Sequence, residues 1–501
     1  MRDRATGRDA AVAVAPQSAV ASAALLSTGQ RSLALAIVAT AMVLDLVDMT
    51  IINVAVPTLQ AQLGASDAEV QWMVAGYSTV FSLLLITGGR LGDMVGYSRA
   101  FLLGVAGFTL TSLLCGIAQT PGQLVAARLL QGGAAAIMLP QVMSLTQIMY
   151  PPHERVSALA LFGVLGGLAA VLGPVIGGFL LSANLLGLGW RPIFLVNLPI
   201  GIAALVLAAR ILPAGKSSRS PRLDVPGTCL VLALLFALIF PLIQGRDYGW
   251  PLWGFVLMGS SVPIAAILMR YSRGRMARDG SALIVPELFH ARGFSFGLLT
   301  TIAFQIATGG LMFTLTLAMQ RGLGFTPAQV GLAHVPYAFG ASFAIGMLSR
   351  KALPRYGPVI ISWGALLMVT GLAALTWLFH TPDLIAHAPP LLALPLLIMG
   401  LGMGLTGGPL PPCALSEVDV DHAGAASGML KAVQQLGAAV GTAAIGTLFF
   451  LVQPEQDMVS ADALRAFSVS AGVICAMLLL TAVLALYIPR NLKIRGHAPP
   501  R

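Results

Sequence analysis

Long apolar runs follow one another along almost the whole of this 501-residue chain, and they decide its fold class. Hydrophobic residues make up 57% of the sequence and charged residues 10%, whereas a soluble domain typically carries about 25% charged residues. A run of about 20 apolar residues is long enough to cross a bilayer as a helix. We therefore predict an all-α polytopic membrane protein with fourteen transmembrane helices, at about 33–57, 70–88, 100–118, 123–146, 156–181, 192–211, 225–244, 251–271, 294–319, 326–348, 358–379, 389–412, 424–451 and 465–489.

The spacing of these runs predicts two six-helix bundles with an inserted pair of helices between them. Short basic turns that contain glycine follow the second run of each bundle, at 88–99 and 346–358. Two parallel six-helix halves are a known plan for transporters. The predicted parts are a disordered cytoplasmic tail at 1–30, an N-terminal bundle at 31–211, the inserted pair and its linkers at 212–293, a C-terminal bundle at 294–489 and a cytoplasmic tail at 490–501.

The net charge of +10 is best explained by membrane topology. Most of the 29 Lys and Arg residues fall in the tails and in the loops on one side of the predicted membrane. The positive-inside rule then places both termini in the cytoplasm. The arginines assigned to the outer side are Arg191, Arg246, Arg321 and Arg465. We expect the basic charge to attract anionic lipid, and we expect no nucleic-acid partner.

Two carboxylates, Asp45 and Asp48, interrupt the first apolar run. A charged side chain at the centre of a bilayer costs about 2.5 kcal/mol or more, so such residues usually have a function. Their three-residue spacing places both on one face of a helix. Two carboxyl groups so close titrate as a coupled pair, which suits a carrier that takes up and releases protons. For Asp45 the alternative is a structural hydrogen bond to Thr50 or Asn53.

Arg128 is expected to be the one Lys or Arg well inside a spanning run. The rise of a helix places Arg128 about 8 Å below the outer end of the fourth run and Asp48 about 13 Å below that of the first. These depths predict a pair, made directly or through water. The alternatives are that Arg128 only ties helices together or extends to the outer surface.

The fifth run contains the stretch GVLGGLAAVLGPVIGG at 163–178. Small residues at this density allow helices to approach closely, and a proline inside a helix bends it. A gate and ordinary tight packing both fit such a helix. The residues concerned at its end are Gly173, Pro174, Gly177 and Gly178.

Sites of other kinds are not indicated by the sequence. The four cysteines lie far apart within or beside apolar runs, without metal-ligand spacing, so we expect no metal and no disulfide. No phosphate-binding loop, zinc-protease motif or nucleophile elbow occurs in the sequence, so we expect no enzyme. A short interfacial helix is expected around 285–290.

Seven motifs, in order, resemble the fourteen-span drug:proton antiporter branch of the major facilitator superfamily. Asp48 stands at the acidic position of the first motif, and Arg128, Gln131 and Gly132 match the third. The motifs are VDMTIINVAVP (47–57), GRLGDMVGYSR (89–99), ARLLQGGAAA (127–136), GPVIGG (173–178), WRPIFLVNLPIG (190–201), MQRGLGFTPAQVGL (319–332) and AGAASGMLKAVQQLG (423–437).

The resemblance implies a rocker-switch fold of two halves around a central cavity. It implies that Asp48 and Arg128 take part in proton coupling and that the glycine–proline motif at 173–178 marks an exporter. It also implies a cytoplasmic gate loop after the second span, with Asp93 at the mouth of the third. The gate-loop residues are Gly89, Asp93, Gly96 and Arg99.

Several positions depart from the family pattern. Met94, Tyr97 and Ser98 stand where the family usually has basic residues, which weakens a transferred charge network at the gate. Pro192 replaces a usual aromatic residue, and Lys431 and Gln434 occupy positions where the branch typically has Asn and Arg. Asp45 lies outside the pattern, so the resemblance gives it no role.

The expected function is a proton-coupled antiporter that exports drugs, antibiotics or other amphipathic small molecules, including cationic ones, by alternating access. The coupling ion is the proton, without a cofactor. The alternative is a proton-coupled symporter that imports a nutrient; a membrane-embedded transferase or a channel lacks support from clustered catalytic residues. Expected partners are the small-molecule substrate and the bilayer, with a membrane-fusion protein added if the source is a Gram-negative bacterium. The sequence specifies neither the cargo nor the oligomeric state.

Overall fold

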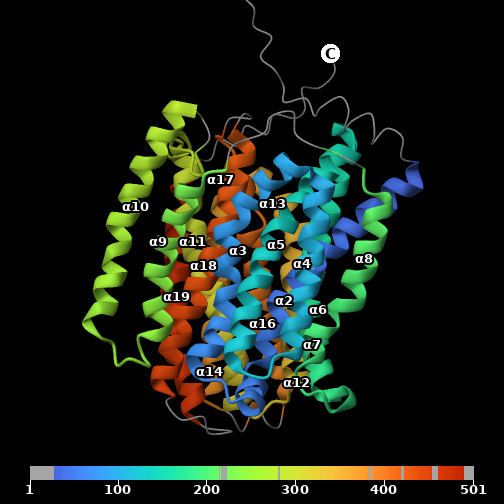
Figure 1. Cartoon of the computed structure of the whole chain (residues 1–501). Coiled ribbons are helices and arrows are strands. Elements are labelled where there is room, and N and C mark those ends of the chain that lie inside the picture. The colour runs from blue at the N-terminus through green and yellow to red at the C-terminus, as the bar shows by residue number, and fades with distance from the viewer. Residues whose placement is uncertain are drawn as a thin grey trace, which may run out of the picture.

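Long helices standing side by side form the whole of the molecule that the computed structural model describes, and no strand occurs in these ranges (Figure 1). The described residues are 27–213, 215, 223–279, 282–381, 384–385, 388–418, 422–453 and 461–489. Thirteen helices are long and apolar enough to cross a membrane. The 32-residue helix α6 (Pro152–Ala183) brings the bundle to the fourteen predicted spans.

The N-terminal six spans follow the predicted order, with the sixth broken into two pieces. They are α2 (Thr28–Leu63), α3 (Asp67–Val95), α4 (Tyr97–Ile117), α5 (Pro121–Met149), α6, and α7 (Pro192–Leu195) with α8 (Asn197–Ile211). Serine residues cap the starts of α2 and α3. At α3 the Ser66 hydroxyl accepts from the Glu69 N–H at 3.2 Å, and the Glu69 carboxylate accepts from the Ser66 N–H at 2.8 Å. Such a capping box satisfies two backbone donors that a helix start leaves free.

The remaining helices comprise an inserted pair and a second set of six spans. The pair is α9 (Val225–Gln244) and α10 (Leu252–Asp279). The expected interfacial helix is a short 3₁₀ turn, η2 (Pro286–His290). The second set is α11 (Arg292–Leu317) with η3 (Ala318–Gly322), α12 (Pro327–Phe343) with η4 (Ala344–Leu348) and α13 (Ser349–Tyr356), α14 (Val359–Phe379), α16 (Ala393–Gly407) with η5 (Pro389–Leu392) and α17 (Leu410–Ala414), α18 (Ala423–Val452), and α19 (Ala461–Ala485).

The most extensive contacts between the N-terminal set and the C-terminal set are those of α6 with α12 and of α3 with α18, and α2 also contacts α11 and α12. Within each set the helices contact their own neighbours, for example α3 with α5 and α11 with α18. This arrangement gives two packed groups that meet along two seams. The predicted limits of the N-terminal bundle (31–211), the inserted pair (212–293) and the C-terminal bundle (294–489) stay a prediction.

The inserted helix α9 covers the seam between α3 and α18. Its Ile239 and Ile243 are buried in one apolar cluster with Ala75 of α3 and Ala443 of α18. The Leu242 carbonyl accepts from the Thr447 hydroxyl of α18 at 2.8 Å. By contrast α10 contacts α9 and leaves most of its surface exposed, as expected of a helix that faces lipid.

The two sets are held together at one end of the bundle. We call this the far end, where α2 ends and α3 begins; the opposite end, where α2 begins and α19 ends, is the terminal end. At the far end the Gln320 amide donates to the Val54 carbonyl at 2.9 Å, and the Thr447 hydroxyl donates to the Gln71 side chain at 3.1 Å. Towards the terminal end the described start of α18 is exposed at Gly424, Ala425, Ser427 and Lys431. The halves are therefore closed on each other at the far end.

Candidate functional site

Asp48 lies in the middle of α2 and is completely buried. One carboxylate oxygen forms an ion pair with the Arg128 guanidinium of α5. The other oxygen accepts from the Gln131 amide at 3.0 Å and from the Asn197 amide at 2.9 Å. Because a buried charge is tolerated only with a partner and further hydrogen bonds, this set of donors explains how a carboxylate is kept inside the membrane region. The sequence-based pairing of Asp48 with Arg128 is confirmed as a direct contact.

Arg128 is 1% exposed, and five contacts hold its guanidinium in place. Besides Asp48, its Nε donates to the Met73 carbonyl at 3.0 Å and its Nη1 donates to the Gln131 side chain at 2.7 Å. The Tyr77 ring lies 4.4 Å from its central carbon, within the range of a cation–π interaction, and the Phe194 ring lies at 5.8 Å. Arg128 does not extend to the surface, so that alternative is wrong.

Asp45 lies one turn before Asp48 on α2 and is 1% exposed. Its carboxylate accepts a hydrogen bond from the Tyr77 hydroxyl of α3. The two partners considered for it from the sequence bond elsewhere: the Thr50 hydroxyl donates to the Leu46 carbonyl at 3.0 Å, and the Asn53 amide donates to the Met49 carbonyl at 3.4 Å. Asp45 therefore has a structural partner, but on a neighbouring helix.

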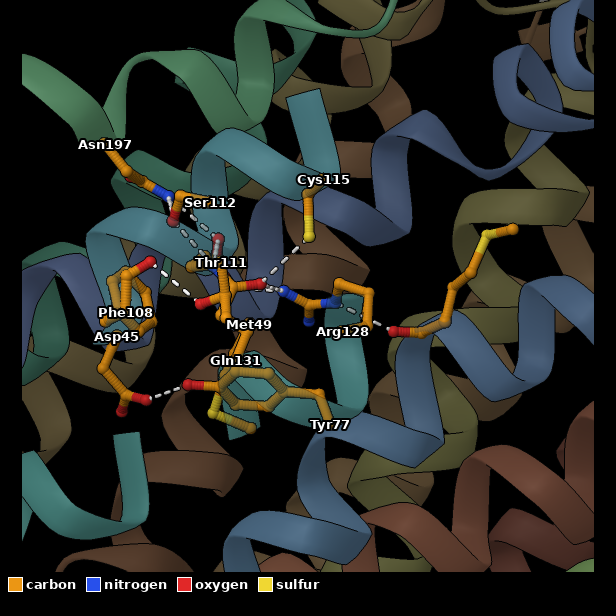
Figure 2. Close-up of polar contacts among 12 residues, drawn as sticks. Asp45, Met49, Tyr77, Phe108, Thr111, Ser112, Cys115, Arg128, Gln131 and Asn197 are labelled. Carbon is orange, nitrogen blue, oxygen red and sulfur yellow. Dashed lines mark hydrogen bonds and ion pairs between the residues drawn. The ribbon is translucent and has the colours of Figure 1, made fainter. Parts of the chain in front are cut away.

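Tyr77 connects the two acidic residues. Its hydroxyl binds Asp45, while the face of its ring lies against the Arg128 guanidinium that binds Asp48 (Figure 2). Figure 2 also shows Ser112 and Asn197 on the other side of this cluster, where the Ser112 hydroxyl accepts from the Gln131 amide at 2.9 Å. The side chains come from α2, α3, α4, α5 and α8, so every one of these helices helps to fix the ion pair. We call Asp45, Asp48, Tyr77, Arg128, Gln131 and Asn197 the carboxylate cluster.

Replacing Tyr77 by Phe keeps the ring over Arg128 and removes only the hydroxyl on Asp45. We expect a moderate loss of stability, about 1–3 kcal/mol, because a buried carboxylate loses its hydrogen-bond donor. The Asp48–Arg128 pair should remain, so gradient-driven transport should fall less than in an Asp48 variant. Thermal unfolding and initial uptake rates of purified Tyr77→Phe protein measure the two effects. Unchanged stability would show that the hydroxyl does not support Asp45.

The predicted gate loop forms the turn between α3 and α4. Gly96 has φ +103°, a conformation that favours glycine, and it both ends α3 and starts α4. The Asp93 carboxylate accepts from the Tyr97 hydroxyl at 2.9 Å, and the Arg90 guanidinium donates to the Ala282 carbonyl before η2. Arg99 is exposed. The gating role of Gly89, Asp93, Gly96 and Arg99 stays a prediction.

The glycine–proline motif of α6 is a contact surface on two sides. A Cβ atom added to Gly173 or Gly177 would overlap Thr50 or Ile51 of α2. A Cβ on Gly178 would overlap the Pro327 carbonyl of α12, and a Cβ on Gly331 of α12 would press on the Pro174 carbonyl. The motif thus lets α6 touch its own half and the other half at once, close to the far end.

Two further basic residues lie within the helix bundle. Arg321, assigned to the outer side, is buried at the end of η3 and donates to the Gln60 side chain of α2. Gln60 in turn donates to Asp67 at 2.8 Å, and Asp67 pairs with Arg246 at 2.7 Å. Lys431 lies eight residues after the start of α18, so the prediction that Arg128 alone among Lys and Arg lies well inside a span is wrong.

Within the described ranges, no group of three or more His, Cys, Asp or Glu side chains is placed so that it could hold a metal ion. Cys115 and Cys413 are buried, and the Cys115 thiol lies 3.6 Å from the Gln131 side chain. The described cysteines are free.

Sequence reasoning missed Tyr77, Ser112 and Asn197, and it gave Gln131 no role beyond a motif match. The available signal was polarity: Asn197 and Gln131 are amides in otherwise apolar spanning runs. A buried amide needs partners, so each could have been marked as facing other polar groups.

Comparison with known proteins agrees with this architecture. The sequence pattern of the Major Facilitator Superfamily matches residues 38–442. The chain belongs to the major facilitator superfamily. It is a multi-pass membrane transporter, and the matched residues run from α2 through the inserted pair into α18.

Relatives in this superfamily include proteins named for antibiotic transport or resistance. The chain is 41% identical over 441 residues to a probable actinorhodin transporter of Streptomyces coelicolor, which covers 86% of this chain and 75% of that protein. It is 33% identical over 466 residues to a puromycin resistance protein of Streptomyces alboniger, covering 90% of each. It is 30% identical over 416 residues to a tetracenomycin C resistance and export protein of Streptomyces glaucescens, covering 82% of this chain and 74% of that one.

Solved structures of transporters share the fold. A crystal structure of a peptide transporter aligns with a TM-score of 0.65 and 16% identity, covering 96% of this chain and 100% of that one. A bacterial homologue of the human lysosomal transporter Spinster, solved inward-facing and unoccupied, aligns with a TM-score of 0.63 and 17% identity, covering 92% and 97%. At these identities the likeness establishes the fold of this superfamily member.

Proposed function

We propose that this transporter is a proton-coupled antiporter that exports antibiotics or other amphipathic small molecules across a bacterial cytoplasmic membrane. The observation that carries the proposal is the buried Asp48–Arg128 ion pair with its two amide donors. The names of the relatives support export of antibiotics as the class of activity. Ionisable residues inside a membrane region commonly mark ion or proton pathways, and this is why the proposal assigns proton coupling to the pair.

Protonation of Asp48 would remove the negative charge that holds Arg128. The guanidinium would then be a buried cation without its counter-ion, which is an unfavourable state costing several kcal/mol. A rearrangement of α2 against α5 would relieve it, and this rearrangement can be coupled to movement of the two halves. In this proposal both termini, and therefore the terminal end, lie on the cytoplasmic side. A protein closed at the far end is then in the state that is open to the cytoplasm.

Uptake of puromycin into proteoliposomes with an imposed pH gradient tests the proposal. For protein inserted with its terminal end outward, an acidic lumen should drive puromycin inward, and collapse of the gradient with nigericin should abolish the accumulation. Protein-free liposomes measure the passive response of this weak base. Accumulation by the protein that is unaffected by nigericin would contradict proton coupling. Uptake that instead requires an acidic exterior would favour the symporter alternative.

A further inference from the structure

The accessible charge in the region between the halves is positive, although the first apolar run suggested acids. Asp45 and Asp48 are 1% and 0% exposed, and each is occupied by the hydrogen bonds described above. Arg128 is 1% exposed and is paired. Lys431 of α18, by contrast, is exposed. Among the charged side chains that α2, α5 and α18 place well inside the described spans, Lys431 is the one that a cargo could reach.

The level of Lys431 in the bundle follows from one contact between α18 and α2. The Gln435 amide lies 3.3 Å from the Met49 sulfur, with these two helices running in the same direction. Lys431 lies one turn before Gln435, and Asp45 lies about one turn before Met49. Lys431 is therefore level with Asp45, on opposite halves, about 12 Å along α18 from its start. Electrostatic interaction between these two residues agrees with this placement.

The direction of Lys431 follows from the residues around it on α18. Gly428, one turn earlier, faces Ile86 of α3, and Gln435, one turn later, faces Met49 of α2. Residues three or four apart share one side of a helix. Lys431 therefore points toward the N-terminal half and away from lipid. Its exposure means that open space lies there between the halves.

The opposite wall of this space is apolar. Met42 and Met49 of α2 lie three residues before and four residues after Asp45, on the same face, and both are half-buried. Methionine side chains adapt to ligands of varied shape. On the α18 side Gln434 is half-buried beside Lys431 and adds a hydrogen-bonding group. The space thus has a flexible apolar wall on one side and an ammonium group with an amide on the other.

We propose that Lys431 is a specificity residue that binds the acidic group of an amphipathic organic anion, whose apolar body packs against Met42 and Met49. The inference rests on the proposed function, since it adds amphipathic acids to the cargo of that exporter, beside weak bases such as the puromycin of the transport test. It departs from the cationic cargo considered from the sequence, because both carboxylates that suggested a cation are covered. An ammonium group beside apolar side chains attracts a carboxylate or an acidic phenol more strongly than one surrounded by bulk water.

Asp45 is a negative charge level with Lys431 on the opposite half, and it attracts the ammonium group without a direct contact. An acidic cargo must compete with this carboxylate for the ammonium group. Removing the charge at Asp45 should therefore tighten the binding of acids, whereas removing the charge at Lys431 should weaken it. Opposite effects from two residues on different halves distinguish an ionic site from general damage to the fold.

Binding of three pyrene probes to purified protein in nanodiscs tests the site without any proton gradient. The probes are 1-pyrenebutyric acid, its methyl ester and a pyrenebutyl trimethylammonium salt, measured by fluorescence anisotropy. Wild-type protein should bind the acid at least tenfold more tightly than the trimethylammonium salt. Lys431→Gln should remove this preference, Lys431→Arg should keep it, and Asp45→Asn should increase affinity for the acid. Lys351→Gln, at an exposed lysine on α13, is the control and should match wild type.

Equal binding of the acid and the trimethylammonium salt by wild-type protein would overturn the site, as would an unchanged preference in Lys431→Gln. Failure to bind any of the three probes would also count against the site as described. Selective binding of the acid together with uptake that ignores a pH gradient would leave the site in place and refute proton coupling. The two proposals can therefore fail separately.

Discussion

An Asp48→Asn variant is expected to lose gradient-driven uptake almost completely. Asn keeps the size of the side chain, and its oxygen can still accept from Gln131 or Asn197, but it carries no charge and cannot bind and release a proton. It also leaves Arg128 buried without a counter-ion, and breaking a buried pair in this way typically costs about 3–5 kcal/mol. We expect both transport and thermal stability to fall, with uptake reduced by at least about 100-fold.

The double variant Asp48→Asn/Arg128→Gln separates these two effects. Removing both charges removes the unpaired guanidinium, so stability should recover towards the wild-type value while transport stays absent. Thermal unfolding of purified protein and puromycin uptake into proteoliposomes with an acidic lumen measure the two quantities. Wild-type uptake by the single Asp48→Asn variant would rule Asp48 out as the proton-binding group.

A Gly178→Ala variant is expected to have the second-largest effect on transport. The added Cβ would overlap the Pro327 carbonyl, so α6 and α12 could no longer approach as they do at the far end. Adding a methyl group to a tightly packed site typically costs about 1–3 kcal/mol. Since the cost falls on the state closed at the far end, about 1.4 kcal/mol would change the ratio of the two states tenfold. Initial uptake rates should fall by about 10-fold or more.

Two further glycines provide matched tests of that expectation. Gly331→Ala presses on the same interface from the α12 side, at the Pro174 carbonyl, and should reduce uptake in the same way. Gly166→Ala lies on α6 itself, but its Cβ would be 3.7 Å from the Leu46 side chain, an ordinary contact. Gly166→Ala should therefore transport at close to the wild-type rate. Equal rates in all three variants would show that close contact of α6 with α12 is not needed.

From the sequence one can predict how deep in the membrane a residue of the site lies. Composition and run length establish a helical membrane protein, and the rise per residue then places Asp48 and Arg128 at compatible depths. Lateral neighbours depend on the rotation and packing of several helices, which run length does not define. This is why the donors Tyr77 and Asn197 were missed, and why Thr50 and Asn53 were considered for Asp45 although their side chains bond to their own helix.

The surroundings of Arg321 and the depth of Lys431 were missed for a related reason. Arg321 stands at the end of an apolar run, where a sequence favours an exposed loop, but η3 continues the helix and buries the guanidinium against Gln60. Lys431 lies close enough to the basic side of its run to be counted with a loop. The predicted run at 424–451 already placed it about two turns inside the span, and the start of α18 at Ala423 agrees with that depth.

The position of α9 makes the two sides of the transporter unequal. Because α9 packs against both α3 and α18, it covers the seam between the two halves on this flank. Movement of one half relative to the other would have to slide along α9. A hydrophobic molecule dissolved in the bilayer cannot slip in through this flank without displacing Ile239 and Ile243. On the opposite flank α6 and α12 are in direct contact, with close approaches at Gly178 and Gly331, and the inserted pair does not cover them. Cargo that partitions into the membrane and cargo that arrives from water would then reach Lys431 by different routes.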